Sequence, residues 1–169
     1  MASAKRDVYL RPSVLDRLMA APGAGRVGQQ TVIGVQELRD AVRRDLDWLL
    51  NTKRWLPHDF EGLPEVKTSL LNYGMPDLSP FSPANGRDLA SLARTIEELI
   101  RCYEPRLRPS SVRVAVLTTP VAVPKSGEER EKPHFRIDAV LCVDPVNEPV
   151  SFDTEIDLDR RQVSVRGDL

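Results

Sequence analysis

The sequence predicts an α+β fold, with two main amphipathic helices and short helical turns packed on a mostly antiparallel sheet of about four C-terminal strands. Up to residue 107, apolar residues recur at steps of three and four, the period of one helical face. Beyond it, apolar and polar residues alternate, which is typical of half-buried strands. Because the helices come first and the strands follow with mostly short connections, we expect an antiparallel meander. The alternating runs are Val112–Leu117, Phe135–Asp144, Phe152–Asp157 and Val163–Val165.

The length of 169 residues is that of one domain. We expect residues 1–34 to be a flexible segment with a short docking helix, because glycines at 23, 25 and 28 follow a weakly helical stretch. The alternative is a tail held weakly against the domain. Residues 35–169 then form a single α+β domain. We expect neither a signal peptide nor a membrane span, because the apolar runs are too short.

The first long helix is predicted at Val35–Arg54. Its apolar stripe consists of Val35, Leu38, Val42, Leu46 and Leu49. Gly34 is an acceptable N-cap, and Lys53 and Arg54 give the last turn the positive charge that the helix dipole favours. The alternating arginines and aspartates between residues 39 and 47 indicate a solvated, self-compensated face.

The proline-rich stretch at 56–87 connects the two long helices. A short helix is expected at Pro64–Asn72, followed by a turn at Asn72, Tyr73 and Gly74. Asn72 and Gly74 tolerate left-handed backbone angles, so we interpret the three residues as a fold-defining turn. Tyr73 and Met75 are expected to fill the gap between the long helices.

The second long helix is predicted at Asp88–Leu107, with Asp88 as its cap and Pro105 ending it. Its stripe consists of Leu89, Leu92, Ile96, Leu99 and Tyr103, and we expect it to pack on the first helix and on the sheet. Glu104 lies where the helix dipole favours a cation, so this carboxylate needs a positive partner. The turn Glu104-Pro105-Arg106 is therefore a candidate site.

Most kinds of chemistry find no support in the sequence. The balance of 24 basic and 25 acidic residues argues against general attraction to nucleic acid or an anionic membrane. His58 and His134 lack the spacing of metal ligands, so no metal and no cofactor is expected. Cys102 and Cys142 are expected to be buried, reduced thiols. Neither a phosphate-binding loop nor a nucleophile elbow is present.

A carboxylate pair is the remaining catalytic option. Glu104 would act as the acid, with Asp77, Asp138 or Asp153 as its partner, as in glycosidases. However, a chain with 25 acidic residues contains such pairs by chance, and aromatic platforms for a sugar are scarce at 5% aromatic residues.

Several motifs occur together in one order. They are Leu49-Leu50-Asn51-Thr52-Lys53-Arg54, then Ser69-Leu70-Leu71-Asn72-Tyr73-Gly74-Met75-Pro76-Asp77, then the helix that ends in Glu104-Pro105-Arg106, then the four-strand tail. In this arrangement the chain resembles the TssE family of type VI secretion baseplate subunits. That family is similar to the wedge proteins of contractile phage tails, once labelled lysozyme-like. The similarity extends over residues 10–168.

The resemblance implies a structural, non-enzymatic protein of a cytoplasmic baseplate assembled at the inner membrane. Its partners would be the wedge subunits TssF and TssG, with TssK as a further candidate, and the sheath subunits TssB and TssC. It would join the wedge and help to initiate sheath polymerisation, since an open sheet edge offers unpaired backbone groups to an incoming strand. The alternatives are a peptidoglycan glycosidase and the equivalent subunit of a phage or tailocin.

By the same resemblance, Glu104, Pro105 and Arg106 belong to the wedge contact. Arg106 would make a forked contact to a partner, so that Arg106→Ala leaves the isolated fold nearly unchanged. The chemistry of the residues alone favours a local pair bridging Pro105.

Overall fold

The computed structural model describes residues 34–54, 64–117, 132–143 and 146–167. The α+β class is confirmed by the long helices α2 (Val35–Asn51) and α4 (Gly86–Tyr103) and a four-stranded antiparallel sheet. The strands are β1 (Arg113–Val116), β2 (His134–Val143), β3 (Val146–Asp157) and β4 (Gln162–Gly167). The short turns are α3 (Pro64–Lys67), η1 (Leu70–Asn72) and η2 (Pro109–Ser111). The predicted docking segment and the connection between β1 and β2 lie largely outside the described residues.

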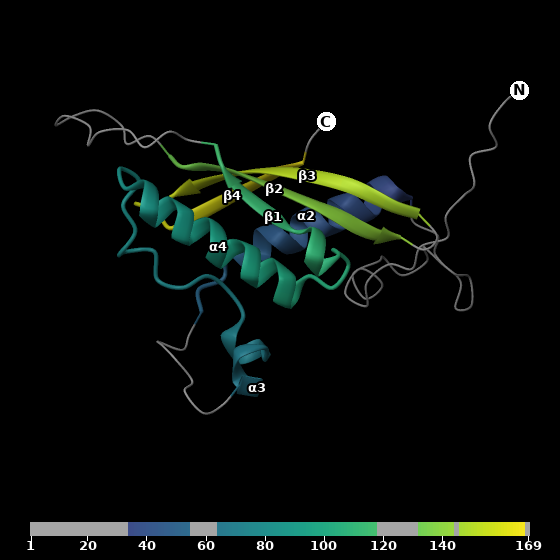
Figure 1. The fold of residues 1–169 in the computed structure, drawn as a ribbon, viewed down its shortest axis with the longest axis horizontal. Helices are drawn as coiled ribbons and strands as arrows, with labels where there is room; N and C mark the ends of the chain where they lie inside the picture. The colour runs from purple at the N-terminus through teal and green to yellow at the C-terminus, as the bar shows by residue number, and fades with distance from the viewer. Residues whose placement is uncertain (1–33, 55–63, 118–131, 144–145, 168–169) are drawn as a thin grey trace, which may run out of the picture.

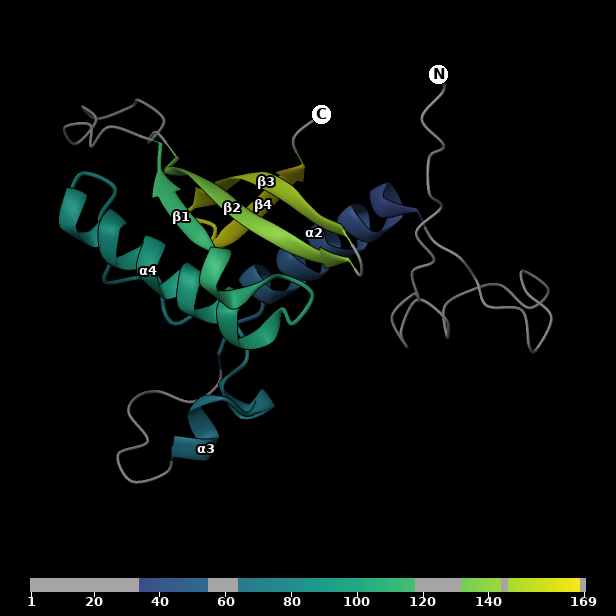
Figure 2. The same ribbon diagram turned by 45° about the vertical axis from the view of Figure 1, so that its right-hand side comes forward.

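The sheet is the predicted meander, with strand order β1-β2-β3-β4 and every neighbouring pair antiparallel. Both long helices lie on one side of it, α2 beside β4 and α4 beside β1, whereas α3 projects away from these two layers (Figure 1 and Figure 2). Each helix contacts the sheet more than the other helix. The second helix thus makes both contacts expected of it, with the first helix and with the sheet, and the contact with the sheet is the larger.

The core lies between the helix layer and the inner face of the sheet. Its largest fully buried side chains include Leu46, Leu49, Leu92, Ile96, Ile100, Phe135, Ile137, Leu141, Phe152 and Ile156. Alternate residues of β2 and β3 point to the other face, where Arg136 pairs with Asp153 and Ser151 with Asp138. The predicted alternation thus separates an apolar inner face from a charged outer one.

Helix α2 ends three residues earlier than predicted. Lys53 and Arg54 therefore lie beyond its last turn, which contains no basic residue. The chain leaves the helix because it pairs with the segment at Met75. The Met75 amide donates to the Thr52 carbonyl at 2.8 Å, and the Arg54 amide donates to the Met75 carbonyl at 2.8 Å.

Helix α4 begins two residues earlier than predicted and is capped by Asn85. The Asn85 side chain accepts a hydrogen bond from the Arg87 amide at 3.0 Å. Asp88 is not the cap, since its carboxylate accepts from the Ser82 amide outside the helix at 3.0 Å. The predicted short helix at Pro64–Asn72 is likewise split into α3 and η1, because the Ser69 hydroxyl interrupts it as the cap of η1.

The two cysteines differ from the prediction of buried thiols. Both Cys102 and Cys142 are free and exposed. Cys102 lies on the solvent face of α4, and Cys142 lies on the outer face of β2, opposite the buried positions of that strand. Burial was expected because free cysteines are most often buried, but each falls on the solvent side of its element.

The chain after α4 runs along β2 before β1 begins. The Cys142 amide donates to the Arg106 carbonyl at 2.8 Å, and the Arg108 amide donates to the Val140 carbonyl at 2.9 Å. These bonds hold the Glu104-Pro105-Arg106 turn at the point where α4 meets the sheet.

Candidate functional site

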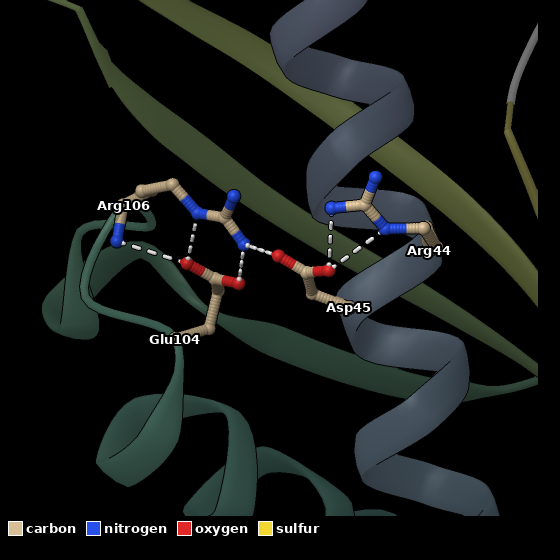
Figure 3. Close-up of polar contacts among 4 residues, drawn as sticks. All are labelled: Arg44, Asp45, Glu104 and Arg106. Carbon is tan, nitrogen blue, oxygen red and sulfur yellow. Dashed lines mark hydrogen bonds and ion pairs between the residues drawn. The ribbon is translucent and has the colours of Figure 1, made fainter. Parts of the chain in front are cut away.

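The turn after α4 contains a buried, fully engaged carboxylate. Glu104 is only 3% exposed. Arg106 donates from Nε to Oε1 at 2.7 Å and from Nη2 to Oε2 at 2.5 Å, while its own amide donates to Oε1 at 3.1 Å. Pro105, between them, is exposed. The cation that the helix end required is therefore Arg106, and the pair bridges the proline locally (Figure 3).

Helix α2 adds Asp45 and Arg44 to this pair, and the four side chains form one polar network. The Arg106 Nη2 also donates to Asp45 Oδ2 at 2.6 Å, and Asp45 Oδ1 accepts from Arg44 Nε and Nη2 at 3.1 and 2.9 Å. Figure 3 shows Arg106 reaching from the turn toward α2, where its Nη2 atom contacts the carboxylates of both Glu104 and Asp45. Arg44 also stacks over the Trp48 ring at 5.0 Å. Alternating charges thus tie α2 to the turn.

The carboxylates of this network keep Arg106 charged. Burial acts to lower the pKa of Arg106, but the hydrogen bonds and charge of Glu104, then of Asp45, outweigh burial and raise that pKa above its ordinary value. The Arg106 guanidinium thus stays charged in a mostly desolvated place beside the buried Glu104. Such a pair is costly to break, because either partner alone is a buried, uncompensated charge.

An open hollow of about 390 Å³ lies next to the network. Trp48, Tyr73, Tyr103 and Pro105 line it together with the network carboxylates and Arg106. Trp48 is 43% exposed although it is a large aromatic side chain. The site is therefore an aromatic surface held from behind by ion pairs.

The predicted turn of Asn72, Tyr73 and Gly74 lies beside this hollow and contributes Tyr73 to its lining. Asn72 accepts from Arg54 Nη1 at 3.1 Å and donates to the Lys67 carbonyl at 2.8 Å. The Tyr73 ring meets the Tyr103 ring edge to face, with centroids 5.3 Å apart. Burial, and then the charges of Asp45 and Glu104, raise the pKa of Tyr73.

Gly74 is required at its position for two reasons. Its φ of +105° is unfavourable for other residues, and a Cβ would lie 2.4 Å from the Thr52 carbonyl oxygen. Gly74 approaches Thr52 this closely because the chain after α2 pairs there with Met75.

The carboxylates proposed for catalysis are not brought together. Asp138 and Asp153 lie on the outer face of the sheet, hydrogen-bonded to Ser151 and Arg136. Asp77 accepts from the amide and hydroxyl of Ser79, which lower its pKa. Both Glu104 oxygens are occupied by Arg106, so the geometry supplies no acid paired with a second free carboxylate at this turn.

Other site types find no geometric support in the ranges that the structure describes. No group of three or more histidine, cysteine, aspartate or glutamate side chains there is arranged to hold a metal ion. Among the helices of the same ranges, none is long and apolar enough to cross a membrane.

Sequence reasoning missed Asp45 and Trp48. Asp45 lies in the stretch of α2 interpreted as a solvated, self-compensated face, and Trp48 follows directly after that stretch. A signal was present, since Trp48 is a large aromatic outside the stripe of Leu38, Val42, Leu46 and Leu49, three residues after Asp45. An aromatic on the polar side of an amphipathic helix indicates a contact that the apolar stripe does not use.

The fold and the site define a small α+β structural subunit, whose central polar residues bind one another and brace an open aromatic surface. The profile of the baseplate wedge protein gp25 family matches residues 36–146, and the chain belongs to this family. No curated protein and no solved structure matches this chain. The predicted family is thus confirmed, and with it a structural role in the baseplate of a contractile apparatus, in contact with other baseplate subunits.

Proposed function

We propose that this chain is the wedge subunit of a type VI secretion baseplate, which joins TssF- and TssG-type subunits and helps to initiate the sheath. The observation that carries the proposal is the aromatic hollow beside Glu104-Pro105-Arg106, within the part of the chain that matches the wedge family. The assembly would stand at the cytoplasmic face of the inner membrane, with TssK as a further neighbour and TssB and TssC as the sheath subunits.

The three residues of the turn have different roles in this proposal. The Arg106 fork is occupied by Glu104 and Asp45, so the forked contact predicted for a partner is not free in this structure. In the proposal, Glu104 and Arg106 instead fix the position of the exposed Pro105. Contact with the wedge then falls on Pro105 and on Trp48, since half-exposed tryptophans are frequent anchors of protein interfaces.

The rigidity of this surface supports these separate roles for the positioning residues and the contact residues. A surface already held by ion pairs loses little conformational entropy when a partner binds, which increases affinity. Tyr103 contributes in the same way, because its hydroxyl donates to the Ser69 carbonyl at 2.8 Å and ties η1 to the end of α4.

The test is a pull-down from the native cell with Trp48→Ala in the full chain. We expect recovery of the wedge subunits to fall by about tenfold or more, with the fold intact by circular dichroism and urea unfolding. Leu117→Ala is the matched control, because Leu117 is similarly exposed at 49% but does not line the hollow. Wild-type recovery with Trp48→Ala would exclude the hollow as the wedge contact.

The proteins recovered with the wild-type chain distinguish the alternatives. Wedge and sheath subunits of a secretion system support the proposal. Tail proteins of a phage or tailocin instead assign the chain to that particle, and the genes beside its own provide an independent check.

A further inference from the structure

The outer edge of β4 is occupied by side chains of α2. The Asn51 side-chain amide makes two hydrogen bonds with Val163: Oδ1 accepts from the backbone amide at 2.8 Å, and Nδ2 donates to the carbonyl at 2.8 Å. One turn earlier, Asp47 Oδ1 accepts from the Val165 amide at 3.3 Å, and Arg43 Nη1 donates to the Val165 carbonyl at 3.4 Å. These are the groups that an edge strand offers to another strand.

Side chains of α4 cover the opposite edge of the sheet, beside β1, in the same way. Glu97 Oε2 accepts from the Val114 amide at 3.1 Å, and Arg101 Nη2 donates to the Val112 carbonyl at 3.1 Å. Glu97 and Arg101 also pair with each other across one helical turn. The open edge expected from the sequence is thus covered at Val163 and Val165 of β4, and at Val114 of β1 and Val112 just before it.

The side chains reproduce the chemistry of a missing strand. A carboxamide carries one acceptor oxygen and an N–H donor group, as a peptide group does, and Asn51 uses both on a single residue. Arg43, Asp47 and Asn51 follow one another at intervals of four residues, which places all three side chains along one line of the helix surface. Because the line lies along β4, the side chains meet alternate residues of the strand.

We propose that Arg43, Asp47 and Asn51 form a latch on the β4 edge, and that an extended strand from another chain pairs with Val163 and Val165 only after it displaces these side chains. The identity of that strand as part of the sheath rests on the proposed function. The latch itself does not, because it is a property of the free subunit. In the free subunit it keeps a second copy of the chain from pairing edge to edge.

Residue-resolved amide exchange of the full chain tests the latch. In Asp47→Ala/Asn51→Ala, which favours helix at both positions, we expect the Val163 and Val165 amides to exchange about tenfold faster or more. The Ser164 amide, which faces β3, should keep its rate. Asn51→Asp retains an acceptor for Val163 and should preserve its protection, and Asp40→Ala at an exposed position of α2 is the matched control.

Unchanged exchange at Val163 and Val165 in the double variant would show that the side chains do not close the edge. Equal acceleration at Ser164 would show that they hold the strand in place instead, which also overturns the proposal.

Sedimentation over a range of concentrations provides the second readout, with a second copy of the chain as the probe strand. We expect the double variant to self-associate and the wild type and Asp40→Ala to stay monomeric. Fast exchange in a variant that remains monomeric throughout would overturn the claim that the latch prevents pairing. Neither measurement involves wedge or sheath subunits, so failure of the secretion assignment would leave this result unaffected.

Discussion

The guanidinium of Arg106 binds both carboxylate oxygens of Glu104 across the single residue Pro105. Glu104 ends α4, and the carbonyl of Arg106 pairs with the amide of Cys142 on β2. The ion pair therefore stands at the junction of a helix and the sheet, and Asp45 connects the junction to the other helix. Removal of either Glu104 or Arg106 should therefore lower the stability of the whole fold.

Arg106→Ala is expected to lower the free energy of unfolding by about 3–5 kcal/mol, because it leaves a buried, unpaired Glu104. This replaces the expectation of a nearly unchanged fold, which assumed that the arginine points to a partner. Urea unfolding at neutral pH measures the change.

Arg94→Ala, at an exposed position of α4, is the control and should change stability by about 0.5 kcal/mol or less. The double variant Glu104→Gln/Arg106→Met should recover part of the loss, because it leaves no unpaired charge. If Arg106→Ala were no more destabilising than Arg94→Ala, the ion pair would not support the junction.

Gly74→Ala is expected to destabilise the protein by more than about 2 kcal/mol, since a left-handed backbone and a contact at 2.4 Å with Thr52 oppose any side chain. Thermal and urea unfolding measure the effect. Gly167→Ala is the matched control, because its Cβ would meet Arg43 Cδ at an ordinary 3.6 Å. Similar stability of the two variants would mean that the turn adjusts and does not define the fold.

Thr154→Val is expected to stabilise the protein by about 1 kcal/mol, because the buried Thr154 hydroxyl has no hydrogen-bond partner among the residues that the structure describes. The residue is 1% exposed and faces Phe135 and Val165 across the sheet. Valine has nearly the same shape and carries no polar atom. The midpoint of urea unfolding should rise with an unchanged slope, and a lower midpoint would contradict the assignment of an unsatisfied hydroxyl.

Arg136→Gln is expected to raise the pKa of Asp153 toward its ordinary value of 3.8. In the wild type, the hydrogen bond from Arg136 is the main cause that lowers this pKa, and burial acts weakly against it. A lowered pKa in the folded state stabilises the fold above the pKa of the unfolded chain, and this contribution is lost as the pH falls through the folded value. Carboxyl-carbon NMR titration measures the shift.

The control for this titration is Asp77 in the same sample. Its pKa is lowered mainly by hydrogen bonds from Ser79, so Arg136→Gln should leave it unchanged. Added salt should weaken the Asp153 shift, because the pair is exposed and screened. An Asp153 titration that is identical in both proteins would remove Arg136 as its cause.

Periodicity predicted the two helices and four strands well, because burial of one face imposes a period on the residues of each element. Helix ends were predicted less well, since they depend on partners distant in sequence. Met75 draws the chain out of α2 at Thr52, and Asn85 rather than Asp88 caps α4. The exposure of Cys102 and Cys142 also depends on which side each element presents to the core.

The sequence by itself determined the α+β class, the order of the meander and the need of Glu104 for a cation, because each rests on local pattern or local charge. The wedge family was also evident from the sequence, through the resemblance of its ordered motifs and the match over residues 36–146. The chemistry of the turn alone already favoured the local pair of Glu104 with Arg106. Only the tertiary structure decided that Asp45 joins this pair across 61 residues and that Asn51 binds Val163 across 112. These pairings depend on how α2 lies beside the turn and beside β4. Side-chain hydrogen bonds have no period in the sequence, so packing alone brings their partners together.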